Sequence, residues 1–321
     1  MISLLRVFML LVGMSIFAVY TAAAVGGVFL LQWVVANPPN PFFLFGVFVS
    51  VALLGGYVGY KRGVVQTVAS IDTLRVTPER APELYRRLER LCLRMDVSQP
   101  TLLVADFELP NALSVGGPRE GAIILDRGLF EILTIDELEG ILAHELAHIE
   151  RLDTFVNTLA ITVARLVASL VFIVFAPFII FLAGIDRATA WFDGRPGTER
   201  FGLADVFQQT VGILVVILLS VLTVLFLAHS RRQEFAADRR AAEVSGRPLA
   251  LARALVKIHH ASEPRRNLRS LLYIHRDTEN EPSRWLSTHP PLDDRVDKLV
   301  ELSEGQRGGQ KLRQLRPETM R

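Results

Sequence analysis

Four long runs of apolar residues interrupt the mixed polar and apolar pattern of the chain. They cover about residues 7–35, 42–60, 166–184 and 211–228. Each run is 18 residues or longer and contains no charged side chain. A helix needs about 20 apolar residues to cross the hydrocarbon layer of a membrane, which is roughly 30 Å thick. The pattern therefore predicts four transmembrane helices.

Two other interpretations of these runs exist. A core helix of a soluble enzyme accounts for any one run, but poorly for four in one chain. The first run also resembles a secretory signal peptide, because Arg6 precedes it and Ala22-Ala23-Ala24 resembles a cleavage site. The apolar region of a signal peptide is only about 7–15 residues long, whereas this run continues to Val35. Its length favours a membrane helix over a cleaved signal.

The runs divide the chain into membrane and polar segments. Residues 1–60 hold the first two spans, and residues 154–229 hold a transmembrane hairpin. The segments 61–153 and 230–302 have the composition of ordinary soluble protein. Residues 303–321 are rich in Gly, Gln and Arg, and this composition predicts a disordered basic tail.

Basic residues near the ends of the spans predict the orientation in the membrane. The loop at 36–41 has no charge, and the second loop on that side, 185–210, holds three arginines. More basic residues lie on the other side: Arg6, Lys61, Arg62, Arg151, Arg231, Arg232, Arg239 and Arg240. Because lysine and arginine are concentrated in cytoplasmic loops, both termini and both polar segments are predicted to be cytoplasmic, at a plasma membrane.

The overall composition excludes several other classes of protein. Half of the residues are apolar, 21% are charged and the mean hydropathy is +0.34, which excludes disordered and collagen-like chains. A single cysteine, Cys92, cannot form an internal disulfide. The formal net charge of +2 gives no reason to expect a nucleic acid partner. The oligomeric state stays open.

The first polar segment predicts a mixed α and β structure. Thr77-Pro78 is typical of a helix start, and the apolar spacing that follows predicts an amphipathic helix to about Met95. Thr101–Val104 and Ala122–Leu125 predict short strands, with Asn111–Gly117 as an edge segment or loop between them. After the fourth span, the pattern predicts helices at about 230–246, 248–261 and 292–303.

A metal-binding motif lies on a further helix of this segment. Thr134 and Glu137 form a capping box, so a helix is predicted from about Ile135 through residue 150. It contains His144-Glu145-Leu146-Ala147-His148, in which the two histidines project from one face about 6 Å apart along the axis. That spacing lets both imidazoles reach one Zn²⁺, with Glu145 beside a water activated by the metal. The alternative is two histidines that face solvent.

A third ligand is needed, because catalytic zinc sites usually have three protein ligands. Glu234 is the best candidate, since Asp238 follows it on the same helical face and can orient His144 through the second ring nitrogen. Two spans separate His148 from Glu234, so the chain returns to the same side of the membrane. The remaining histidines are weaker candidates: His229, His259, His260, His275 and His289.

These motifs, in this order, resemble the HtpX-like membrane zinc metalloproteases, a family that includes the CaaX prenyl endopeptidases of the first type. The resemblance implies a four-span, mainly α, zincin-like fold with a small β-sheet. The segment Asn111-Ala112-Leu113-Ser114 resembles the edge strand that pairs with substrate in this family, although Leu113 stands where an aromatic residue is common. Ser287-Thr288-His289-Pro290-Pro291 with Arg295 resembles its C-terminal element. The resemblance implies that His289 and Arg295 lie near the transition-state oxyanion or steady the helix of Glu234.

Each of these additional motifs also has a purely structural interpretation. Asn111 is equally able to begin a turn after Pro110, and His289 to cap the turn at Pro290-Pro291. Asp153, which the resemblance places next to the metal ligands, is also compatible with a carboxylate on the helix surface.

Together, the motifs predict a membrane-bound zinc endopeptidase that holds one Zn²⁺ per chain. His144, His148 and Glu234 bind the metal, Glu145 acts as general base and then as general acid, and misfolded membrane proteins or other extended peptides are the expected substrates. A processing protease for lipidated or other specific peptides, of the CaaX type, is one alternative. A catalytically silent membrane scaffold is another. A zinc transporter is disfavoured because the four runs contain no ionisable ligand.

Overall fold

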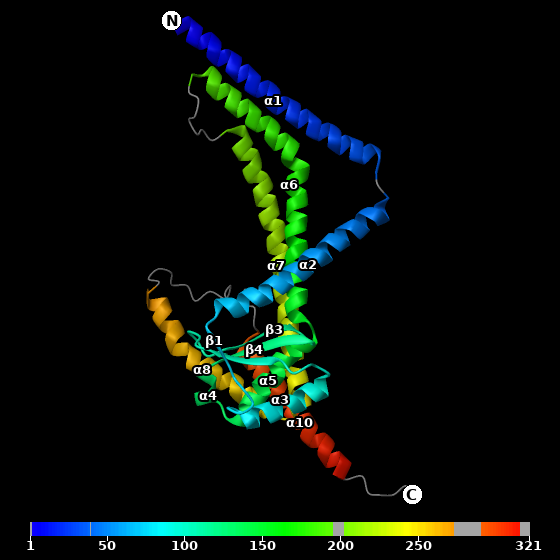
Figure 1. The fold of residues 1–321 in the computed structure, drawn as a ribbon, viewed down its shortest axis with the longest axis vertical. Helices are drawn as coiled ribbons and strands as arrows, with labels where there is room; N and C mark the ends of the chain where they lie inside the picture. The colour runs from blue at the N-terminus through cyan, green and yellow to red at the C-terminus, as the bar shows by residue number, and fades with distance from the viewer. Residues whose placement is uncertain (1, 39, 195–201, 273–289, 315–321) are drawn as a thin grey trace. The chain divides into compact units, whose positions relative to one another are not determined.

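The computed structural model describes residues 2–38, 40–194, 202–272 and 290–314. These residues form a mainly helical protein with one small sheet, as the sequence predicts (Figure 1). Four long helices each contain a segment apolar enough to cross a membrane. They are α1 (Ile2–Ala36), α2 (Pro41–Ser70), α6 (Asp153–Phe192) and α7 (Leu203–Ser245).

These helices extend well beyond the apolar runs. The segment 185–210, predicted as the connection between the third and fourth spans, is helical at both ends, because α6 continues to Phe192 and α7 already begins at Leu203. Hydropathy marks the part of a helix that crosses the hydrocarbon layer, whereas a helix continues until its backbone is interrupted. The first helix-breaking residues after Gly184 are Gly194 and Pro196.

The chain forms two compact units. The first consists of residues 1–55 and 160–223, and the second of residues 56–159 and 224–321. In the first unit, glycines let α1 and α6 approach closely: a Cβ added at Gly27 would lie 2.9 Å from Pro177, and one at Gly184 would lie 2.4 Å from Tyr20. Small residues at such contacts are a common means of helix association in membranes.

The second unit contains the sheet. Its strands are β1 (Thr73–Arg75), β2 (Thr101–Ala105), β3 (Ala112–Gly117) and β4 (Glu120–Asp126). The order is β1-β2-β4-β3, with β2 and β4 parallel and the other two pairs antiparallel. The two predicted strands are therefore confirmed as β2 and β4, and the segment from Ala112 forms the edge strand β3. No sequence pattern predicted β1, which has only three residues.

The described part of the second unit also contains five further helices: α3 (Pro82–Met95), α4 (Leu129–Ile132), α5 (Ile135–Glu150), α8 (Pro248–Leu272) and α10 (Leu292–Gln314). The predicted start of α3 at Pro78 is wrong. Thr77 accepts backbone hydrogen bonds from Arg80 and Ala81 in a turn, and Pro82 takes the first helical position instead. The prediction of a disordered tail from residue 303 is also corrected, because α10 continues to Gln314. No proline interrupts its backbone before Pro317, and Gly308 and Gly309 only weaken a helix, by about 1 kcal/mol each.

Both faces of the sheet are buried. Successive side chains of a strand point to opposite faces. Leu102 and Ile123 therefore join the main core with α3, α5 and α8, while Leu103 and Ile124 face the other way and pack against Val68 at the end of α2. The main core holds α5 against the sheet, and this packing positions the motif that α5 carries.

Hydrogen bonds to the carboxylate of Glu137, one of them from a charged lysine, also stabilise the N-terminus of α5. Glu137 accepts a hydrogen bond from the Thr134 backbone at 2.8 Å and one from Lys257 Nζ on α8 at 2.7 Å. Burial raises the pKa of the Glu137 carboxyl, but the hydrogen bonds from Lys257 and Thr134 outweigh burial and hold the pKa below its usual value. A carboxyl with a lowered pKa in the folded state stabilises the fold above its unfolded-state pKa of about 4.3, and this contribution is lost as the pH falls further.

We therefore expect Glu137→Gln to destabilise the protein in a pH-dependent way. Glutamine keeps the capping geometry but removes the charge that pairs with Lys257, a loss of about 1 kcal/mol for a partly exposed pair. At neutral pH the thermal midpoint in detergent should fall by about 2–4 °C. The difference from wild type should shrink as the pH is lowered from about 5 to 3. The matched control is the exposed Glu131→Gln, and an equal, pH-independent shift in both variants would contradict the prediction.

Candidate metal centre

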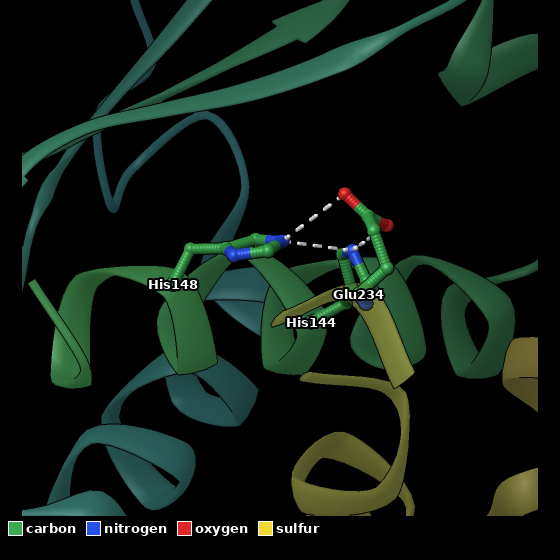
Figure 2. A group of neighbouring side chains, drawn as sticks. All are labelled: His144, His148 and Glu234. Carbon is green, nitrogen blue, oxygen red and sulfur yellow. Dashed lines mark hydrogen bonds and ion pairs between the residues drawn. The ribbon is translucent and has the colours of Figure 1, made fainter. Parts of the chain in front are cut away.

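The centre is built on the C-terminal half of α5. The Thr134 hydroxyl accepts from the Glu137 backbone, and the Glu137 carboxylate accepts from the Thr134 backbone, so the helix begins at Ile135 as its capping box predicts. From that start, His144 and His148 fall one turn apart on the same face. Both project towards Glu234, which comes from α7 (Figure 2).

The ligand atoms of these three side chains converge. The Nε2 atoms of His144 and His148 are 3.2 Å apart. The Glu234 carboxylate places Oε2 at 3.6 Å from His144 Nε2 and Oε1 at 3.9 Å from His148 Nε2. In a tetrahedral zinc site with bonds of about 2.0–2.1 Å, two ligand atoms lie about 3.3 Å apart. The three side chains therefore form a possible metal site of the right size.

A carboxylate lies behind each imidazole. Asp238 Oδ1 is 3.0 Å from His144 Nδ1, and Asp153 Oδ2 is 2.7 Å from His148 Nδ1. An Nδ1–H that donates to a carboxylate leaves the Nε2 lone pair of a neutral imidazole free to bind a metal. Two such lone pairs then face each other beside a carboxylate. A cation between them satisfies all three groups at once, so the donor set fits a metal.

The charge balance supports the same interpretation. Four carboxylates of this cluster are less than 9% exposed: Glu145, Asp153, Glu234 and Asp238. Among the described residues, Arg295 is the buried cationic side chain that contacts them, so buried carboxylates outnumber buried cations in this cluster if the imidazoles are neutral. Buried charges are costly unless they are paired or coordinate a metal. A divalent cation at the site would offset part of this excess of negative charge.

The electrostatics of His148 reflect this environment. Burial opposes the charged imidazole, but the hydrogen bond to Asp153 and the charges of Glu145 and Glu234 outweigh burial and raise the pKa of His148. Glu145, next to His144 in the motif, is itself only 8% exposed.

Arg295 lies on the other side of the ligands. Its guanidinium binds Asp238 with two hydrogen bonds of 2.7 Å, and its NH1 atom is 3.3 Å from Glu234 Oε2. Arg295 therefore contacts two residues of α7, and its role at the transition-state oxyanion or in steadying this helix stays a prediction. His289, the other residue of that expectation, lies outside the described residues.

The predicted substrate-binding segment forms one edge of the sheet. Asn111 lies immediately before β3, and Ala112, Leu113 and Ser114 are its first three residues. β3 pairs with β4 on one side and is the last strand in the sheet order. α5 packs beside β3, so the edge strand and the histidines belong to neighbouring elements.

Residues 78–303 match the model of peptidase family M48. The chain belongs to this family. Two proteins to which the chain is similar are both called protease HtpX homologs. The one from Acaryochloris marina is 35% identical over 280 residues, which cover 79% of this chain and 89% of the relative. The one from Gemmatimonas aurantiaca is 34% identical over 237 residues, which cover 71% and 78%.

Among solved structures, the crystal structure of S. mikatae Ste24p is similar to this M48 peptidase, with 19% identity and a TM-score of 0.48. The match covers 90% of this chain and 66% of the Ste24p chain. The family match and the four apolar helices together identify a multi-pass membrane protease.

Gln233, beside a ligand of the candidate metal centre, and Asp126, at the end of β4, are buried polar residues that were not predicted from the sequence. Gln233 donates to Asp153, and Asp126 accepts from the backbones of Phe107 and Gly128 at 2.8 Å each, which fixes the loop that leads into β3. Neither residue belongs to a recognisable motif. For Gln233, the one available signal was its position beside Glu234.

Proposed function

We propose that this M48 peptidase is a zinc-dependent endopeptidase that cleaves extended polypeptides at the cytoplasmic surface of the plasma membrane. The observation that carries the proposal is the convergence of His144, His148 and Glu234 next to the buried Glu145. Two imidazoles and one carboxylate are the ligand set of many catalytic zinc sites, which keep a fourth position for water or substrate.

In this proposal, Glu145 is the residue that transfers the proton. A zinc ion held by these three ligands would act as a Lewis acid and would lower the pKa of a bound water molecule towards about 7. The Glu145 carboxylate accepts the proton as the water oxygen attacks the scissile carbonyl, and then delivers it to the leaving amine. Asp238 and Asp153 hold the two imidazoles in the tautomer that this arrangement requires.

The edge strand β3 is the proposed binding surface for substrate. A strand with an open edge pairs with an extended peptide through main-chain hydrogen bonds, so the backbone provides most of the affinity. Residues 111–114 would therefore select polypeptides that are unfolded, with little demand on side chains. This selection suits the removal of damaged membrane proteins, which we propose as the cellular role.

The location at the membrane follows from α7. Glu234 lies about 9 Å along this helix from Ala228, the last residue of the apolar run, so the site lies close to the membrane surface. The greater number of basic residues on the side of the polar segments supports a cytoplasmic site.

Metal removal tests the proposal. We expect a chelator to reduce cleavage of an unfolded membrane protein by the detergent-solubilised enzyme to background, and Zn²⁺ at one equivalent per chain to restore it, with Mg²⁺ as the matched control. The same protein in its folded state and a prenylated peptide serve as competing substrates. Cleavage that survives chelation would contradict a metal mechanism. Preference for the prenylated peptide would favour a CaaX-type role, and zinc binding without any hydrolysis would favour a silent scaffold.

A further inference from the structure

Gln233 is a buried polar residue next to a proposed metal ligand. It precedes Glu234 on α7 and is 3% exposed. Its amide nitrogen donates a hydrogen bond to Asp153 Oδ1 at 2.8 Å. The other oxygen of the same carboxylate is 2.7 Å from His148 Nδ1. One carboxylate therefore connects the amide on α7 to the imidazole on α5.

The amide limits the rotation of that carboxylate. The terminal torsion of an aspartate is broad and has no deep minima, so a single contact to His148 would leave the carboxylate plane poorly defined. Two contacts at opposite oxygens define it. Arg151 also approaches Oδ1, but at 3.6 Å and with a side chain that is 38% exposed. Gln233 is thus the well-ordered second partner of Asp153.

The two imidazoles are supported in different ways. Asp238, behind His144, pairs with the guanidinium of Arg295, which compensates its charge. Asp153, behind His148, accepts its close hydrogen bond from the neutral amide of Gln233, whereas the guanidinium of Arg151 approaches it only to 3.6 Å. A carboxylate that accepts from Nδ1–H makes the imidazole a stronger metal ligand.

We propose that Gln233 is a positioning residue for the metal: it fixes Asp153 so that His148 directs its Nε2 atom to the point where His144 and Glu234 meet. Gln233 touches neither the metal nor the substrate. The inference rests on the proposed zinc site and adds to it a residue that sets metal affinity.

Zinc affinity of the full-length protein, measured in detergent by competition with a chelator, tests this role. Mutation of the residues that support metal-binding histidines through hydrogen bonds typically weakens metal binding by about 10- to 100-fold. Gln233→Met preserves length but removes the donor, and should weaken zinc binding by about that factor. Gln233→Asn keeps an amide that is one methylene too short, and should also bind zinc more weakly than wild type.

A matched control separates this effect from the packing of the two helices. Arg240 also joins α7 to α5, through two hydrogen bonds of 2.9 and 2.7 Å to Glu150, but it is not part of the metal cluster. Arg240→Gln should therefore leave zinc affinity within about twofold of wild type. In an Asp153→Ala background, Gln233→Met should have no further effect, because the residue acts through Asp153.

Three results would overturn the role of Gln233 while the zinc site stands. These are wild-type affinity in Gln233→Met, an equal loss in Arg240→Gln, and an undiminished effect in the Asp153→Ala background. Wild-type protein that binds no zinc would instead overturn the proposed function and this inference together.

Discussion

Glu145→Gln is expected to abolish peptide cleavage while zinc stays bound. Glutamine has the size of glutamate but cannot accept and return a proton, and general acid–base catalysis contributes about 10²–10⁴-fold to such reactions. His144, His148 and Glu234 are unchanged, so the variant should still bind one metal per chain. The measurement is the rate of cleavage of an unfolded membrane protein, together with the metal content of the same sample.

A conservative control makes this result specific. Glu301 is an exposed glutamate on α10, and Glu301→Gln should cleave at the wild-type rate. Comparison of protein N-termini in membranes that contain wild type or Glu145→Gln would then identify the natural substrates. If Glu145→Gln retains its zinc and still cleaves, another group must move the proton, and the proposed mechanism is wrong.

The sequence predicted the parts of this protein that depend on local pattern. Four apolar runs marked the four long helices, and Thr134 with Glu137 marked the start of α5 at the correct residue. The even number of crossings between His148 and Glu234 was enough to predict that both lie on the same side of the membrane. These features need only hydropathy, helix periodicity and capping chemistry.

The features that the sequence did not predict depend on contacts between residues distant in the chain, or on helix ends that the sequence marks only weakly. Gln233 and Asp153 are 80 positions apart, and nothing in either local sequence specifies their hydrogen bond. β1 has three residues and exists because β2 provides its partner. The composition of residues 303–314 predicted disorder, but these residues continue the helix α10 that begins at Leu292. Composition alone does not determine where such a helix ends.

The second large effect is expected for stability, from Arg295→Met. The side chain of Arg295 is 9% exposed and binds Asp238 in a bidentate pair, with Glu234 at 3.3 Å. Removing one partner from a buried ion pair leaves an uncompensated charge and costs about 3–5 kcal/mol. At about 2–4 °C per kcal/mol, the thermal midpoint of the metal-free protein in detergent should fall by about 6–20 °C. Metal-free samples are needed because bound metal stabilises the folded state by itself.

Two further variants show whether uncompensated charge is the cause. Arg295→Met combined with Asp238→Asn removes the buried negative charge that Arg295→Met leaves without its partner, and keeps an oxygen at the position that lies 3.0 Å from His144 Nδ1. The double variant should therefore be more stable than Arg295→Met alone. Arg239→Met, at an exposed position on the same helix as Asp238, should change stability by less than about 0.5 kcal/mol. If the double variant is no more stable than Arg295→Met, the loss comes from packing, and Arg295 supports α7 through its volume and not through its charge.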